Sequence, residues 1–305
     1  MTATPLSLSR LVRGFPVLAE SLKGVERAAA TDAPVLILGE PGTGRSTLVR
    51  AIHEASPRAA APFVEVDVGP IPSTLFESEL FGYRAGAFTG AERANEGRVA
   101  RAENGSLVLD HVEELPLATQ PKLLRLVAER RYAPLGAQEK TADVRFLAIG
   151  SEDLPLRVAR ETFRSDLFYR LEVLSFLLPP LRERRRDLPA VLDHLLADLA
   201  VRFSRPNLRL APRARAWMLE HPWPGNLRQL RNVLERGLIL AGEGAIDPAA
   251  PEGSSEGRPR PLLEVEKEMI REALAFTRGH QGQAAQLLGI SRKALWEKRK
   301  RYGIP

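Results

Sequence analysis

A short hydrophobic run that ends in a glycine-rich turn is the feature that most constrains how this chain folds. Residues 33–38 (APVLIL) have the length and aliphatic content of a buried strand, residues 39–47 (GEPGTGRST) form the turn, and residues 48–53 (LVRAIH) have helical character. In this order they make a phosphate-binding loop, because the amides of the turn and the start of the following helix both attract anions. The sequence therefore predicts an α/β fold that binds a nucleotide.

The glycine turn departs from the usual phosphate-binding pattern at one position. The pattern has Lys after its last glycine, whereas this chain has Arg45, which keeps the charge but is bulkier and planar. Ser46 follows, where a hydroxyl usually meets Mg²⁺. The alternative is a glycine turn without a nucleotide, and we favour nucleotide binding because the flanking strand and helix are both present. The residues of the turn expected to contact the nucleotide are Gly39, Gly42, Thr43, Gly44, Arg45, Ser46 and Thr47.

A second glycine-rich segment lies at residues 79–91 (ELFGYRAGAFTGA). Its last six residues are small apart from Phe88, and glycines on both sides of that ring free the backbone. Two glycines this close together argue against a buried strand. Two interpretations remain: a tight surface turn with Phe88 folded onto the protein, or a loop that presents Phe88 and Thr89 to a partner.

With ELFG followed by GAFTGA, the chain resembles the bacterial enhancer-binding proteins, which are AAA+ ATPases that activate the sigma-54 form of RNA polymerase. The resemblance covers residues 11–304 and implies that the sigma-54 RNA polymerase holoenzyme is a partner. In that family the loop is the tip that touches sigma-54, and nucleotide state raises and lowers it. The sigma-54 contacts implied by the resemblance are Gly86, Ala87, Phe88, Thr89, Gly90 and Ala91.

The resemblance also implies the fold class and the division of the chain. The expected fold is an AAA+ P-loop domain of the α/β class, with a parallel sheet and a helical lid, followed by a small all-α helix-turn-helix domain. Residues 242–261 are rich in Gly, Pro, Ser and Ala, which is typical of a flexible linker. With no receiver domain before the ATPase core, we expect regulation to come from elsewhere or to be absent. The expected parts are a flexible N-terminus (1–10), the α/β subdomain (11–181), the lid (182–241), the linker (242–261) and a Fis-type DNA-binding domain (262–305).

Two further predicted strands each end in an acidic residue. Residues 62–67 (PFVEVD) end at Asp67, and residues 105–110 (GSLVLD) end at Asp110. The second run has the Walker B pattern. We therefore expect Asp110 to hold Mg²⁺ through its oxygens or through water, with the hydroxyl of Ser46 on the same ion.

The resemblance implies two catalytic side chains that are replaced here. In the family, an Asn at the end of the first strand holds a Glu that follows the Walker B acid and polarises the attacking water, whereas this chain has Asp67 and His111. Glu113 or Glu114 could stand in for that Glu, but the strand direction is lost two or three residues further on. We favour a partly buried His111 that is hydrogen-bonded to Asp67, because the two substitutions fall on the two halves of one switch.

Four more residues match family positions that read the nucleotide. Ser151 follows a predicted strand and stands at the first sensor of the γ-phosphate, where the family has Asn. Arg164 and Arg170 match the arginine fingers that reach the nucleotide of a neighbouring subunit, which requires a homo-oligomeric ring, usually a hexamer. The alternative is two surface arginines on a helix. Arg228 matches the second sensor, which contacts the nucleotide from the lid. It lies in a predicted helix that we expect Asn226 to cap.

The C-terminal segment concentrates the positive charge of the chain. The net charge is +6, and from Arg258 onward 11 Lys and Arg residues stand against 5 Asp and Glu residues. Residues 262–277 predict an amphipathic helix. Residues 281–288 and 292–302 predict two more helices joined by a turn at Gly289, a helix-turn-helix that resembles the Fis-type domain and is expected to bind double-stranded DNA at an upstream site. Ser291 is the expected N-cap of the second helix. The expected DNA contacts are Ser291, Arg292 and Lys293 at the groove and Lys298 near phosphate.

Composition and the altered positions set the remaining expectations. The 305 residues include no cysteine, no run long enough to span a membrane and no signal-peptide core, so we expect a cytoplasmic protein without a membrane partner. The predicted function is a sigma-54-dependent transcriptional regulator that binds DNA, ATP and Mg²⁺ and remodels the polymerase through its 86–91 loop. Arg45, Asp67, His111 and Ser151 leave an alternative open. It is a DNA-bound regulator that binds ATP but hydrolyses it weakly, as a scaffold, a mixed-ring subunit or a repressor.

Overall fold

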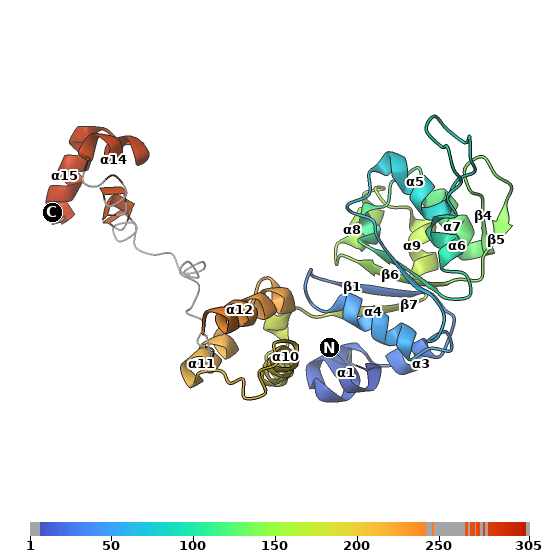
Figure 1. Ribbon diagram of the computed structural model, residues 1–305, viewed down its shortest axis with the longest axis horizontal. Helices are drawn as coiled ribbons and strands as arrows, with labels where there is room; N and C mark the ends of the chain where they lie inside the picture. The colour runs from blue at the N-terminus through green and yellow to red at the C-terminus, as the bar shows by residue number, and fades with distance from the viewer. Residues whose placement is uncertain are drawn as a thin grey trace. The chain divides into compact units, whose positions relative to one another are not determined.

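The computed structural model describes residues 7–241, 246, 266–267, 269–271, 273–274, 277 and 280–302. The chain forms two compact units, residues 1–249 and 250–305 (Figure 1). Among the described residues, no helix is both long enough and apolar enough to cross a membrane.

A parallel sheet of five strands forms the centre of the first unit, in the order β2-β3-β6-β1-β7. Every pair in this sheet is parallel, so all five carboxyl ends meet at one edge. The register places Asp67 opposite Asp110 and Leu38 opposite Gly150 at that edge. The strands are β1 (Val35–Gly39), β2 (Phe63–Asp67), β3 (Ser106–Asp110), β6 (Arg145–Gly150) and β7 (Leu174–Leu178).

Helices cover both faces of this sheet, and the strands are apolar on both faces for that reason (Figure 1). Successive residues of one strand enter different cores: Val108 packs with the first core, while Leu107 and Leu109 pack with the second. The helices of the α/β subdomain are α1 (Leu8–Gly14), α2 (Pro16–Ser21), α3 (Val25–Ala29), α4 (Arg45–Glu54), α5 (Ser73–Phe81), α6 (Gly97–Arg101), η1 (Val112–Glu114), α7 (Gln120–Glu129), α8 (Leu154–Ala159) and α9 (Ser165–Leu171). A two-stranded ribbon, β4 (Arg131–Tyr132) and β5 (Lys140–Thr141), follows α7.

The lid follows β7 through the short 3₁₀ turn η2 (Leu181–Glu183). Its helices pack around the buried Trp223, whose indole Nε1 donates to the carbonyl of Met218 at 2.8 Å. The lid helices are α10 (Leu188–Arg202), α11 (Pro212–Glu220) and α12 (Asn226–Leu240). The lid belongs to the same hydrophobic core as α1–α4, so it is packed onto the α/β subdomain rather than tethered to it.

Two details of the lid differ from the sequence-based expectation. Asn226 was expected to cap α12, but Gly225 occupies the cap position without a side-chain bond, and the Asn226 side chain turns to the P-loop instead. Most of the expected linker, residues 242–261, lies outside the described residues. Its one described residue, Ile246, is buried and pairs with Leu210, because its amide and carbonyl bond the strand-like segment before α11.

The second unit contains α14 (Gln281–Leu287) and α15 (Arg292–Tyr302), joined by a turn at Gly289 with φ +64°. Leu295 of α15 is fully buried against Ala284 and Ala285 of α14. The Ser291 Oγ accepts the amide of Ala294 at 3.1 Å, which confirms the predicted N-cap. The expected helix at 262–277 lies only partly within the described residues, which include buried positions of this core.

Candidate functional site

The P-loop joins β1 to α4 at the carboxyl edge of the sheet. Gly39, Gly42 and Gly44 have φ values of +151°, +81° and +105°, which residues other than glycine rarely adopt. A Cβ on Gly42 would lie 2.7 Å from the carbonyl of Gly225, so the lid sits directly on this turn. Because α4 begins at Arg45, its first amides have no acceptor within the helix and are available to an anion. The turn therefore fits the phosphates of a nucleotide.

Arg45 is bound by main-chain carbonyls in this structure. It is only 7% exposed, and its Nη1 donates to the carbonyls of Gly39 and Gly150, each at 2.7 Å. These carbonyls end β1 and β6, so the guanidinium bridges two strands at the edge where the phosphates are expected. The sequence predicted that Arg45 contacts the phosphates. The structure shows two main-chain carbonyls that compete with the phosphates for its guanidinium.

Asp67 and His111 are in direct contact, as the sequence predicted. The His111 Nδ1 lies 2.7 Å from the Asp67 Oδ1 and 3.8 Å from the Asp110 Oδ1. His111 directly follows β3 with φ +55°, a left-handed conformation, and its amide donates to the Asp110 carboxylate at 2.9 Å. Burial favours the neutral imidazole, but the Asp67 hydrogen bond and the charges of Asp110 and Asp67 outweigh it and raise the pKa of His111.

The acids after His111 have partners of their own. Glu113 is buried and its Oε2 accepts the amide of Ser151 at 3.2 Å, while the Glu114 Oε1 accepts from Arg157 at 3.2 Å. Ser151 thus lies at the end of β6 as expected, joined to η1 through Glu113. No pattern in the sequence predicts this link. Within the described residues, no group of three or more His, Asp or Glu side chains is arranged to hold a metal ion.

The lid reaches the P-loop through side chains that the sequence analysis missed. Glu40, inside the glycine turn, accepts two bonds from Arg182 at 2.6 and 2.8 Å and one from Asn226 at 3.0 Å. The amide of Leu227 donates to the carbonyl of Gly42 at 2.9 Å. Arg228 follows directly, so the expected second sensor is brought to the P-loop. A carboxylate inside a glycine turn was the available sequence signal.

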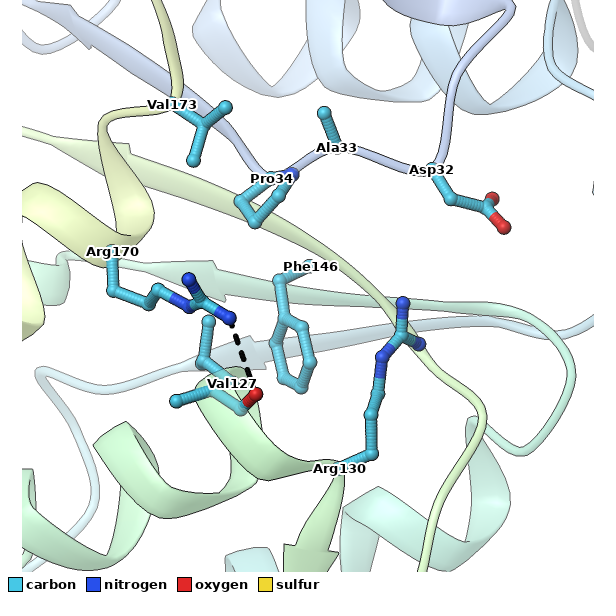
Figure 2. Close-up of a pocket in the computed structure, with 9 residues that line it drawn as sticks. Asp32, Ala33, Pro34, Val127, Arg130, Phe146, Arg170 and Val173 are labelled. Carbon is cyan, nitrogen blue, oxygen red and sulfur yellow. Dashed lines mark hydrogen bonds between the residues drawn. The ribbon is translucent and has the colours of Figure 1, made fainter.

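Arg164 and Arg170 lie at opposite ends of α9. Arg164 is exposed and pairs with Asp166 at 2.7 Å. Arg170 donates to the carbonyl of Ala128 at 3.1 Å and lines a cavity of about 350 Å³ beside the start of β1. Figure 2 shows Arg170 and Arg130 on either side of the Phe146 ring in this cavity. The two expected arginine fingers therefore lie apart, with Arg164 directly before α9 and Arg170 in its last turn.

The 86–91 loop tops a hydrogen-bonded hairpin. Tyr83 exchanges both main-chain bonds with Asn95 at 2.8 and 2.9 Å, and the amide of Gly86 donates to the carbonyl of Ala91 at 2.8 Å. Phe88 is 43% exposed with its ring 4.9 Å from the Tyr83 ring, a state between the two expected ones.

The other loop residues divide into exposed and buried positions. Thr89, Gly86 and Gly90 are exposed and Ala87 is half-buried, which suits a contact surface. Ala91 differs from the expectation of a contact residue, because it is only 5% exposed.

The expected DNA contacts of the second unit also separate into two groups. Ser291, Arg292 and Lys293 are exposed at the start of α15. Lys298 was expected near phosphate, but its ammonium pairs with Glu266, which also accepts the Tyr302 hydroxyl. Lys298 therefore joins α15 to the preceding helical segment in this structure.

Three family matches cover nearly the whole chain. Residues 11–177 match the Sigma-54 interaction domain, residues 182–253 the AAA+ ATPase lid domain, and residues 261–302 the bacterial regulatory protein, Fis family. The chain belongs to the family of sigma-54-dependent transcriptional regulators. Its fold class, an AAA+ α/β domain with a helical lid and a C-terminal helix-turn-helix, is that predicted from the sequence.

Relatives within this family are similar over most of the chain. The alginate biosynthesis transcriptional regulatory protein AlgB of Pseudomonas aeruginosa is 42% identical over 299 residues, which span 95% of this chain and 66% of AlgB. The C4-dicarboxylate transport transcriptional regulatory protein DctD of Rhizobium meliloti is 38% identical over 96% of this chain and 64% of DctD. NtrX of Brucella abortus, solved in complex with ATP, is 32% identical with a TM-score of 0.70, over 95% of this chain and 68% of NtrX. The chain thus spans slightly less than two thirds of the length of AlgB and DctD.

Proposed function

We propose that this sigma-54-family regulator binds upstream DNA and ATP and remodels the sigma-54 RNA polymerase holoenzyme with its 86–91 loop. The observation that carries the proposal is the loop tip: Phe88 is 43% exposed and Thr89 is exposed on a hairpin held by main-chain bonds. An exposed aromatic side chain is typical of a protein-binding anchor.

The P-loop supplies the nucleotide site in this proposal. Main-chain amides of residues 39–47 bind the phosphates, and Ser151 and Arg228 approach them from β6 and from the lid. Mg²⁺ is held by Ser46 and Asp110, which needs no cluster of acids because this ion keeps water and phosphate ligands. Bound ATP supplies a hydrolysable phosphoanhydride whose γ-phosphate is read by these residues.

A homo-oligomeric ring, usually a hexamer in this family, completes the proposed site. Arg164 and Arg170 are the candidate groups that reach the nucleotide of the neighbouring subunit. Mixing a subunit that carries Arg164→Ala with a subunit that carries Asp110→Ala tests this arrangement. Turnover in the mixture above that of either variant alone supports action across the interface, and equal turnover contradicts it.

The loop is tested by transcription from a sigma-54 promoter. Thr89→Ala is expected to abolish activation while ATP binding stays at the wild-type level, because Thr89 lies outside the nucleotide site. Unchanged activation by Thr89→Ala would remove the proposal.

A second candidate is a DNA-bound regulator that holds ATP but hydrolyses it weakly. Three hydrogen bonds favour it: the 2.7 Å bond from His111 to Asp67 and the two carbonyl bonds of Arg45. Loss of a water-activating group costs about a hundredfold or more in rate. Turnover and binding of ATP should be measured together, with His111→Glu as the comparator. If the wild type binds ATP without turnover and His111→Glu restores turnover, the second candidate is favoured. Vigorous turnover by the wild type eliminates it.

A further inference from the structure

The contact between the lid and the P-loop is built from side chains rather than from packing alone. Asn226 is fully buried at the start of α12, and its amide group makes three hydrogen bonds. Its Oδ1 accepts the amide of Leu181 at 2.7 Å, while its Nδ2 donates to the Glu40 carboxylate at 3.0 Å and to the Pro41 carbonyl at 3.2 Å. The Asn226 side chain, in the first turn of α12, therefore connects the P-loop to the turn η2 that follows β7.

Glu40 is the partner on the P-loop side. Its carboxylate accepts the two Arg182 bonds and the Asn226 bond, and these hold the pKa of Glu40 below its ordinary value. Binding phosphate at a glycine turn needs only main-chain amides and a cation, so a carboxylate inside the turn is an added negative charge. Because Arg182 of η2 and Asn226 of the lid donate to this carboxylate, the charge joins the glycine turn to η2 and to the lid.

The main chain at this junction is equally constrained. The Leu227 amide donates to the Gly42 carbonyl at 2.9 Å, and a Cβ on Gly42 would lie 3.1 Å from the Cβ of Arg228. Asn226 has φ +53°, a left-handed conformation that Asn and Asp tolerate better than most residues. The position of Arg228 is thus set by Asn226, two residues earlier on the same helix.

We infer that Glu40 and Asn226 are positioning residues that latch the lid to the P-loop and hold Arg228 at the phosphate site before nucleotide arrives. This inference rests on the proposed binding of ATP by the P-loop. A pre-positioned Arg228 loses less conformational freedom on binding the nucleotide, so the latch raises affinity through preorganisation. Because these bonds join protein groups only, they can be measured in protein without added nucleotide.

Asn226→Asp is the variant that breaks the latch with least change of shape. Asp tolerates the same backbone conformation and keeps the Oδ1 acceptor for Leu181, but it sets a second carboxylate against Glu40. Glu40→Gln combined with Asn226→Asp restores a hydrogen bond of reversed polarity, since Gln can donate to Asp. Asn207→Asp, on an exposed loop of the lid, introduces the same charge away from the P-loop and serves as the matched control.

Two measurements on the whole chain test the inference. In nucleotide-free protein, Asn226→Asp is expected to lower the hydrogen-exchange protection of the Leu227 amide about tenfold or more. Affinity for fluorescent ATP is expected to fall by a similar factor. The double variant is expected to recover part of each loss, because the Pro41 carbonyl still lacks its donor. Asn207→Asp should match the wild type. In an Arg228→Ala background, breaking the latch should weaken ATP binding no further, whereas a merely structural defect would.

Each outcome separates the latch from the proposed function. Unchanged protection at Leu227 in Asn226→Asp overturns the latch whether or not the chain binds ATP. Increased exchange with wild-type ATP affinity overturns the positioning role of Asn226. If wild-type protein binds no ATP, the proposed function fails while the exchange measurement still decides the latch. Should Asn226→Asp fail to fold, Glu40→Gln alone gives the same comparison, with a smaller loss of protection expected because Gln can still accept.

Discussion

The His111 Nδ1 lies 2.7 Å from the Asp67 Oδ1, joining the carboxyl ends of β2 and β3. The register explains the contact, because Asp67 is paired with Asp110 and His111 is the residue directly after β3. The left-handed backbone at His111 then turns its side chain beside the neighbouring strand. With Nδ1 engaged by Asp67, Nε2 is the ring nitrogen that is left to act as an acid or a base.

The first prediction concerns the pH dependence of this pair. Burial opposes protonation of His111, but its acidic neighbours raise its pKa above the ordinary value of about 6.5. A raised pKa in the folded state adds stability that is fully present below the unfolded pKa and is lost as pH rises through the folded pKa. His111→Gln should therefore lower the free energy of unfolding more at pH 5.5 than at pH 8.5. The side chain is 39% exposed, so the difference should be about 0.2–1 kcal/mol.

His194 provides the control for this measurement. Burial lowers the pKa of His194, so its protonation opposes folding as pH falls. His194→Gln should therefore gain relative stability at low pH, the opposite slope to His111→Gln. Denaturant unfolding at a series of pH values gives both slopes. A loss in His111→Gln that is constant or that grows with pH would contradict the assignment of the pair.

The second prediction concerns the close approach of two chain segments at the start of β3. A Cβ on Gly105 would lie 2.0 Å from the carbonyl oxygen of Pro62, which is main chain and cannot move aside alone. Gly105→Ala should lower the free energy of unfolding by about 1–3 kcal/mol or more through overpacking. In Gly14→Ala the nearest atom is the Arg10 Cγ at 4.0 Å, so its stability should change by only about 0.5 kcal/mol. Equal midpoints in thermal unfolding for the two variants would refute this explanation.

The strands and their edge could be predicted because each rests on a local pattern. The glycine turn after 33–38 and the acid that ends 105–110 each specify both the element and its carboxyl end. Parallel strands then gather these ends at one edge, which is how Asp67, His111 and Ser151 come together. The Asp67–His111 bond was predictable for the same reason, since neighbouring strand ends bring the altered positions side by side.

Contacts that depend on lid orientation and on competing partners could not be predicted. Asn226 reads as a helix cap from its local sequence, and only the placement of α12 on the P-loop gives it the stronger acceptor, Glu40. Ile246 lies in a stretch whose composition is typical of a linker, yet a single apolar residue is buried beside Leu210. The two carbonyl partners of Arg45 end strands that lie 6 and 105 residues away in sequence. No local pattern predicts that one side chain bridges both strands.

The third prediction separates the folding role of Phe88 from its proposed contact with sigma-54. Its ring contacts the Tyr83 ring and stays 43% exposed, so it adds little to the core and Phe88→Ala should cost about 1 kcal/mol of stability. Removing an aromatic anchor from an interface typically costs about 2 kcal/mol or more, or roughly thirtyfold in affinity. Leu75→Ala, at a residue 50% exposed on α5, is the matched control and should leave sigma-54 binding unchanged. Equal binding by both variants would exclude Phe88 as the anchor.

The fourth prediction distinguishes the basic residues of α15 by salt dependence. Arg292 and Lys293 are exposed at the start of the helix, so replacing either with Ala should weaken DNA binding and reduce the salt slope by about 1 if it contacts phosphate. Lys298 pairs with Glu266 instead, so Lys298→Ala should destabilise the helix-turn-helix and leave the slope unchanged. Lys23→Ala removes the same charge from the surface of the first unit and is the control. Binding titrations across a range of salt concentrations decide between these roles, and a reduced slope in Lys298→Ala would return Lys298 to the phosphate contact expected from the sequence.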